Sequence, residues 1–310
     1  MQKKQKNACF FSDVKYNKEE FCDEDNIAVK LNELYNSLEN PIQLGAEGAK
    51  LSQAKGQRFN SSYLLRVGFA GSFYFLGGRK MRVNDRHVSF YYENDMDMGT
   101  IEIDPKKTAL LVIDMQHVFI TRPERSENPT EAELREIERW EPFYTKIDEV
   151  VVPNNAKIIK AFREKGIEVA FAKIQCQKKN GADRSLDQKA TGYNELLLPP
   201  GTPSAEIVPE LAPMEDEIVV TKTTDSALAG TPLRLWFQNM GIDTVVCTGV
   251  LTDQCVSGTV RSLADESFKV WLIEDACMAS TQKIQDNELE ILNNIYCHVI
   301  NTEELLDAIK

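Results

Sequence analysis

The chain has 310 residues, of which 42% are hydrophobic and 27% charged, and its net charge is −12. A chain of this length can bury a large core without a disulfide or metal staple. Its acidity argues against nucleic-acid and membrane-surface partners. No stretch reaches the roughly 18–20 apolar residues of a membrane span. No apolar segment follows the lysine-dotted start, as it would in a secretory signal.

The number and spacing of the cysteines and histidines indicate which covalent and metal sites to expect. There are seven cysteines, an odd number with no CxxC pair, and we expect reduced thiols in a cytoplasmic protein. The three histidines, His87, His117 and His298, lie far apart in the sequence. A zinc site is therefore not expected, and we predict neither a metal nor a cofactor.

Residues 1–100 and 101–310 differ in pattern. The first part shows a possible helix at 27–38, a glycine-rich patch around 68–78 and a strand-like stretch at 87–92. It contains no repeat and no motif that points to chemistry, so we treat it as an N-terminal extension of mixed structure and unknown role.

From residue 101 onward, apolar runs and amphipathic segments alternate. The short apolar runs predict six strands, at 108–113, 167–173, 217–221, 243–248, 269–273 and 296–300. Helices are predicted at 153–165, 232–240, about 253–266, 282–294 and 302–309. Short connections between alternating elements imply parallel pairing. The sequence thus predicts a three-layer α/β/α fold with an open, mainly parallel six-stranded sheet.

Three reactive side chains follow three of these strands. Asp114 ends the first strand, Lys222 the third, and Cys255 lies in the first turn of the helix after the fourth. Taken singly, each has a plain structural reading: a turn residue, a solvated lysine and a small core residue. Ligands of open α/β sheets bind at the carboxyl ends of the strands, so their joint placement favours a catalytic site.

These residue types suit nucleophilic catalysis. A helix start and the nearby Lys222 are expected to lower the pKa of the Cys255 thiol. Asp114 is expected to take the thiol proton and later pass it to a leaving amine. The turn 249–255 is expected to direct backbone N–H groups at the attacked carbonyl as an oxyanion hole.

Three segments resemble the active-site blocks of the isochorismatase-like cysteine hydrolases: TALLVIDMQHVF (108–119), IVVTKTTDSA (218–227) and VVCTGVLTDQCVSGTVRSLADE (245–266). The resemblance spans about residues 104–300, so 101–310 is the expected hydrolase domain. It implies a catalytic triad of Asp114, Lys222 and Cys255. It also implies an oxyanion hole from the amides of Leu251 and Cys255, and a cis peptide between Val250 and Leu251.

The resemblance implies hydrolysis of a small amide, ureide or carbamoyl compound through a thioester, with release of ammonia or an amine. Nicotinamidases of this family bind a metal through an Asp and several His. Here no histidine lies between His117 and His298, which argues against that site and that activity. Leu228 also replaces the phenylalanine that usually follows the S-A pair. We expect a homo-oligomer.

Candidate substrate contacts are less specific: His117, Phe119, Trp140, Tyr193 and Val250. Each has a plain alternative as a core or lid-packing residue. Arg184 and Lys189, in the irregular stretch 174–213, are candidates to bind a substrate carboxylate. The simpler interpretation is that both are ordinary charged residues of the surface.

Two other functions remain open from the sequence. An isochorismatase-type vinyl-ether hydrolase would not depend on Cys255 and would release pyruvate from isochorismate. A non-catalytic module would bind a partner through residues 1–100 and use the rest as a scaffold. The intact Asp–Lys–Cys set favours the amidohydrolase.

Overall fold

The structure, a computed structural model, describes residues 86–93, 103–192 and 194–309. They belong to one compact unit that begins at Arg79. The helix expected at 27–38 and the glycine-rich patch at 68–78 lie outside the described residues, as does Tyr193.

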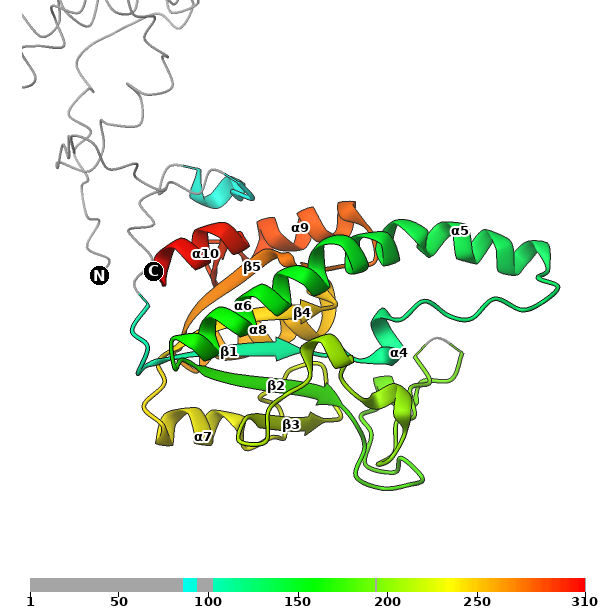
Figure 1. Cartoon of the computed structure of the whole chain (residues 1–310), viewed down its shortest axis with the longest axis horizontal. Helices are drawn as coiled ribbons and strands as arrows, with labels where there is room; N and C mark the ends of the chain where they lie inside the picture. Colours follow the sequence, from blue (N-terminus) through cyan, green and yellow to red (C-terminus); the bar gives the residue numbers. More distant parts are fainter. Residues whose placement is uncertain (1–85, 94–102, 193, 310) are drawn as a thin grey trace, which may run out of the picture. The chain divides into compact units, whose positions relative to one another are not determined.

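A six-stranded sheet, all of whose strand pairs are parallel, forms the centre of the unit (Figure 1). The strand order is β3-β2-β1-β4-β5-β6. The strands are β1 Thr108–Ile113, β2 Glu168–Ile174, β3 Ile218–Lys222, β4 Thr244–Val250, β5 Lys269–Met278 and β6 His298–Ile300. The predicted open parallel sheet is confirmed, and each predicted strand overlaps an observed one.

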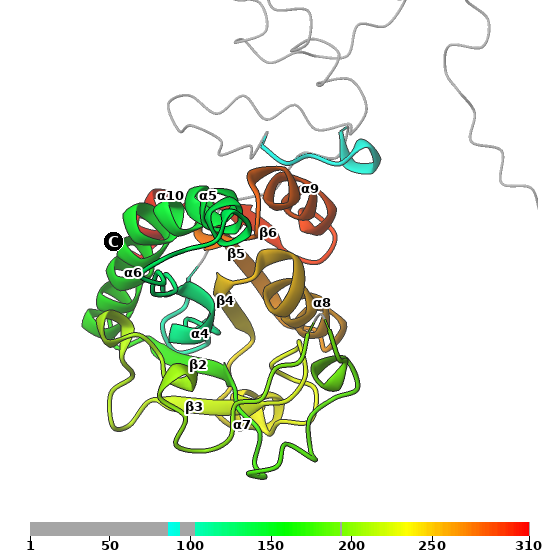
Figure 2. The ribbon, with the colours of Figure 1, turned by 90° about the vertical axis from the view of Figure 1, so that its right-hand side faces the viewer.

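Helices cover both faces of the sheet (Figure 2). One face carries α5 Glu131–Lys146, the π-turn η3 Ile147–Val151, α6 Val152–Glu164 and α10 Thr302–Ala308. The other face carries α7 Leu233–Asn239, the π-turn η7 Thr252–Val256, α8 Ser257–Asp265 and α9 Gln282–Leu292. A short helix, α4 His117–Ile120, follows β1 at the carboxyl end of the sheet. Among the described helices, none is long and apolar enough to cross a membrane.

The apolar run of β1 follows from this layering. Its six residues are all buried. Leu110 and Val112 pack into the core beneath α6, whereas Leu111 and Ile113 pack into the core beneath α8. A central parallel strand is buried on both faces, so every position is apolar or small.

The stretch 87–92 corrects one expectation, because it is not a strand. It ends in a single 3-10 turn, η2 Phe90–Tyr92. The segment before this turn is fixed to the domain by the ion pairs of Arg86 and a hydrogen bond of His87. The Arg86 guanidinium lies 2.8 Å from Glu274 and 2.7 Å from Glu304, and His87 Nε2 lies 2.6 Å from Glu274. These partners are more than 180 residues away in the sequence, so no local pattern reveals them.

Candidate active site

The three reactive side chains predicted from the sequence meet at the carboxyl edge of the sheet. Asp114 directly follows β1, Lys222 is the last residue of β3, and Cys255 lies in η7 after β4. The strand order reverses between β1 and β4, which is where open α/β sheets bind ligands.

Lys222 joins the other two side chains. Its Nζ atom donates to Asp114 Oδ2 at 2.7 Å, to Cys255 Sγ at 3.2 Å and to the carbonyl oxygen of Thr224 at 3.1 Å. An ammonium has three N–H donors, and all three are therefore used. Lys222 and Asp114 are 2% and 1% exposed, and Cys255 is 6% exposed. The only cation that contacts the sulfur is thus a fully bonded, buried ammonium, among the residues that the structure describes.

Burial and charge set the protonation of this cluster. Burial raises the pKa of Asp114 above its ordinary value of 3.8, and the Lys222 ammonium only partly opposes this. Burial alone would lower the pKa of Lys222, but the Asp114 carboxylate and the hydrogen bonds to Asp114 and Cys255 outweigh it and raise that pKa. Lys222 is therefore charged in the resting site, and Asp114 is a stronger base than a solvated aspartate.

The expectation of a lowered thiol pKa is wrong for the resting site. Burial and the adjacent Asp114 carboxylate raise the pKa of Cys255, and Lys222 does not fully compensate. The sequence argument considered the helix start and the lysine, but it did not include the cost of burying a thiolate next to a carboxylate. Cys255 therefore rests as a thiol and needs a base.

Gly249 allows the close approach of β1 and β4 beside Asp114. Its φ is +118°, and an added Cβ would lie 2.0 Å from the carbonyl oxygen of Ile113. No other residue type fits this position. The peptide bond between Val250 and Leu251, just after Gly249, is cis, as the resemblance implies. The carbonyl oxygen of Leu251 accepts hydrogen bonds from the amides of Gln254 at 3.0 Å and Val256 at 3.2 Å, and the second of these bonds forms the π-turn η7.

Two supporting residues were not singled out from the sequence, although both lie in its motif segments. Gln116 is buried and donates to the carbonyl oxygens of Ile174 and Ala205, which ties the segment after Asp114 to β2 and to the loop beyond it. Thr259 Oγ1 donates to the carbonyl oxygen of Cys255 and accepts from the amide of Ala227, both within 2.9 Å. The signals were the D-x-Q motif and the threonine four residues after the cysteine.

Four of the five candidate substrate contacts lie within the described residues, and each packs against or bonds to another part of the protein. His117 Nδ1 lies 3.0 Å from Thr121 Oγ1 within the α4 segment. Phe119 is partly buried and packs against both cores. Trp140 packs edge-on against Phe143 of its own helix, with ring centroids 5.5 Å apart. Val250 is 1% exposed and belongs to the core beneath α6.

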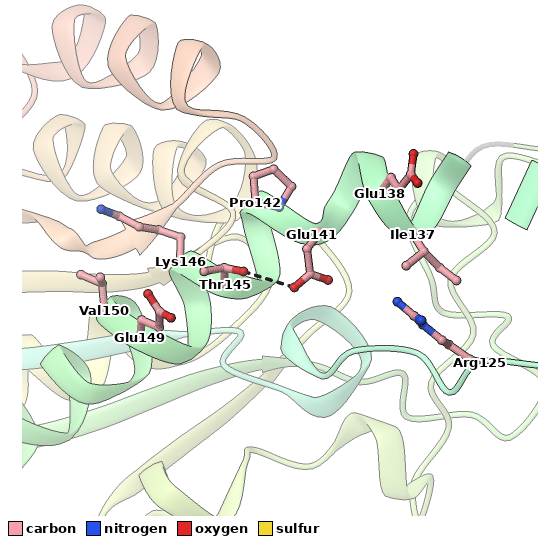
Figure 3. Close-up of a pocket in the computed structure, with 9 residues that line it drawn as sticks. All are labelled: Arg125, Ile137, Glu138, Glu141, Pro142, Thr145, Lys146, Glu149 and Val150. Atoms are coloured by element: carbon pink, nitrogen blue, oxygen red, sulfur yellow. Dashed lines mark hydrogen bonds between the residues drawn. The ribbon is translucent and has the colours of Figure 1, made fainter. Parts of the chain in front are cut away.

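Two surface cavities do not include the three reactive side chains. A groove of about 790 Å³ runs along α5 and is lined by Arg125, Ile137, Glu138, Glu141, Pro142, Thr145, Lys146, Glu149 and Val150 (Figure 3). A second cavity, of about 550 Å³, lies between His87, α6 and the starts of α9 and α10. Within the described ranges, no three His, Cys, Asp or Glu side chains are grouped to hold a metal ion.

Comparison with known proteins gives consistent matches over the described domain. The isochorismatase domain profile matches residues 108–304. The chain is 30% identical to N-carbamoylsarcosine amidase of an Arthrobacter species over 41% of this chain and 49% of that protein. It is also 30% identical to a probable inactive nicotinamidase of Arabidopsis thaliana, over 61% of this chain and 90% of that protein.

A solved structure shares the fold. A cysteine hydrolase from Pseudomonas syringae pv. phaseolicola superimposes with a TM-score of 0.56 at 22% identity. The match covers 67% of this chain and 95% of that one.

Proposed function

This chain belongs to the isochorismatase family of hydrolases, and from that premise we propose that it is a cysteine-dependent amidohydrolase. It cleaves the C–N bond of a small amide, ureide or carbamoyl compound through a thioester. Similarity to an amidase that acts on N-carbamoylsarcosine supports this class of substrate. The observation that carries the proposal is the buried Lys222 ammonium, bonded at once to the Asp114 carboxylate and the Cys255 sulfur.

In the first step, Asp114 accepts the thiol proton and the sulfur attacks the carbonyl carbon. Oδ2 of Asp114 is bonded to Lys222, whereas Oδ1 is buried with no hydrogen-bond partner among the described residues and is open to a proton. The adjacent ammonium stabilises the thiolate as it forms. The carbonyl oxygen takes up the negative charge, and we assign its stabilisation to the amides of Leu251 and Cys255.

In the second step, the C–N bond breaks and the nitrogen takes the proton from Asp114, leaving as ammonia or an amine. The acyl group remains on Cys255 as a thioester. A water molecule then gives a proton to Asp114 and attacks the thioester carbonyl. The sulfur leaves and recovers the proton, which restores the resting site with an acid as product.

We also propose residues 101–310 as the hydrolase domain, with 1–100 as an extension. A reducing, cytoplasmic location fits the five cysteines of the described residues, all of which are free thiols. A homo-oligomer fits the exposed apolar side chains on and just after α7, Leu235, Trp236 and Met240.

The test is ammonia release from a panel of small amides and ureides. We expect turnover by the wild-type chain and none by Cys255→Ala, with both proteins folded by circular dichroism. Cys176→Ala is the matched control, because Cys176 is also buried but its thiol donates to the carbonyl oxygen of Lys178, outside the reactive cluster. Equal turnover by Cys255→Ala, or pyruvate release from isochorismate by that variant, would refute the proposal.

A further inference from the structure

We infer that Asp225 makes this site selective for amides that carry a cationic group next to the scissile carbonyl, and against those that carry a carboxylate there. This inference rests on the proposed function, since it names the substrate class of the same site. Asp225 is exposed, yet its Oδ1 atom lies 3.8 Å from Cys255 Sγ. A carboxylate therefore faces both the solvent and the nucleophile.

The position of Asp225 is fixed by its loop. The next residue, Ser226, bonds through Oγ to Ser262 Oγ of α8 at 2.9 Å, and the amide of Ala227 bonds to Thr259. On the other side, the carbonyl oxygen of Thr224 accepts from Lys222. Gly258 lies beneath, where an added Cβ would lie 3.5 Å from the Cβ atom of Asp225. The carboxylate is thus held beside the sulfur by bonds on both sides of it.

The charges around the thiol sum to a negative value. Asp114 and Lys222 form a 1:1 ion pair, which leaves the carboxylate of Asp225 as the excess charge. The negative charge of Asp225 also repels the Asp114 carboxylate and so helps burial to raise the pKa of Asp114. A substrate cation next to the carbonyl would lie within a few ångströms of this carboxylate and be attracted, whereas a substrate carboxylate would be repelled.

The two cations that the sequence offered for a substrate carboxylate are used elsewhere. Arg184 Nη1 donates to the carbonyl oxygens of Gln188 and Leu196, and its Nε donates to that of Gly181. Lys189 Nζ donates to the carbonyl oxygen of Ala182 at 2.8 Å. Both side chains are therefore bonded to backbone carbonyls of the irregular stretch after β2, and among the described residues neither forms an ion pair with Asp225.

The test measures the charge at Cys255 through the rate of its modification. Two methanethiosulfonate reagents are used, one with an ethyltrimethylammonium group and one with an ethylsulfonate group. Each is attacked by the Cys255 thiolate, which forms a mixed disulfide and releases methanesulfinate. Labelling is assigned by the mass of the peptide that contains Cys255. Rates are normalised to those of a small free thiol, and Cys255→Ala gives the background from the other thiols.

We expect the ratio of cationic to anionic rates to fall about tenfold in Asp225→Asn. The ratio should be largely kept in Asp225→Glu and in the control Glu164→Gln. Glu164 is an exposed residue that ends α6, and its substitution changes the net charge by the same amount.

An unchanged ratio in Asp225→Asn overturns the inference, and so does an equal change of both rates, since a merely structural role would affect both reagents alike. Failure of Cys255 to react with either reagent would overturn the proposed function as well. The two outcomes differ, because an unchanged ratio with a reactive Cys255 refutes only the role of Asp225.

Discussion

Replacing Lys222 with methionine removes the one cation that, within the described part of the chain, pairs with the buried Asp114 carboxylate. The two charged groups are 2.7 Å apart, and their side chains are 0% and 2% exposed. Removing one partner of a buried ion pair costs about 3–5 kcal/mol, because it leaves an uncompensated charge. We expect a loss of that size in the free energy of unfolding of Lys222→Met above neutral pH.

The loss should depend on pH in a definite direction. In the unfolded chain Asp114 has its ordinary pKa of 3.8, and in the folded wild-type chain burial already raises it. Without the ammonium the folded pKa rises further. Between the unfolded and folded pKa values the folded state binds more protons than the unfolded state, so the stability contributed by Asp114 falls as the pH rises through that window. The destabilisation by Lys222→Met is therefore smaller at pH 5 than at pH 8.

Urea denaturation at both pH values measures this effect in four proteins: the wild type, Lys222→Met, Asp114→Asn and the double variant. We expect the double variant to be more stable at pH 8 than Lys222→Met, because it has no buried carboxylate. Equal destabilisation by Lys222→Met at both pH values, or additive losses in the double variant, would show that the pair is not the buried, coupled charge described above.

Two other predictions concern the backbone at the site and the pH dependence of catalysis. Gly249→Ala should prevent folding or lower the free energy of unfolding by more than about 4 kcal/mol, because the added Cβ would collide with the Ile113 carbonyl. The control is Gly166→Ala, where φ is +66° and no atom lies within 4 Å of the added Cβ. It should lower the free energy of unfolding by only about 1–2 kcal/mol, measured by thermal unfolding. Similar losses in the two variants would contradict this account of Gly249. The acid limb of kcat/KM should lie above pH 3.8, since burial raises the pKa of the base Asp114. A limb at or below that pH would rule out Asp114 as the base.

Much of the fold is contained in local sequence patterns. The run TALLVI has no polar face, so it predicts a strand buried on both sides, and it forms β1. The predicted fifth strand ends at Ile273, but β5 continues to Met278. Its pairing with β4 shifts, from Cys247 opposite Leu272 to Gly249 opposite Cys277. Such an irregularity depends on the partner strand and leaves no local signal.

The candidate site was only partly predictable, because some of its contacts depend on segments that are distant in the sequence. Strand ends brought Asp114, Lys222 and Cys255 to one edge, because parallel strands share their carboxyl side. The proximity of Asp225 to the sulfur depends on bonds between its loop and α8, which a strand-by-strand analysis does not include. The raised pKa of the thiol likewise depends on how deeply the sulfur is buried, which spacing alone does not reveal.

The most direct test of the central claim is the mass of the enzyme during turnover. Acid quench of the wild-type chain in the presence of an amide that it hydrolyses, followed by peptide mass spectrometry, should show an added acyl group on Cys255. The added mass equals that of the substrate minus the leaving ammonia or amine, and it should be absent from Cys255→Ala. Ammonia release with no adduct on Cys255 after rapid quench, or with the adduct on another cysteine, would contradict the account.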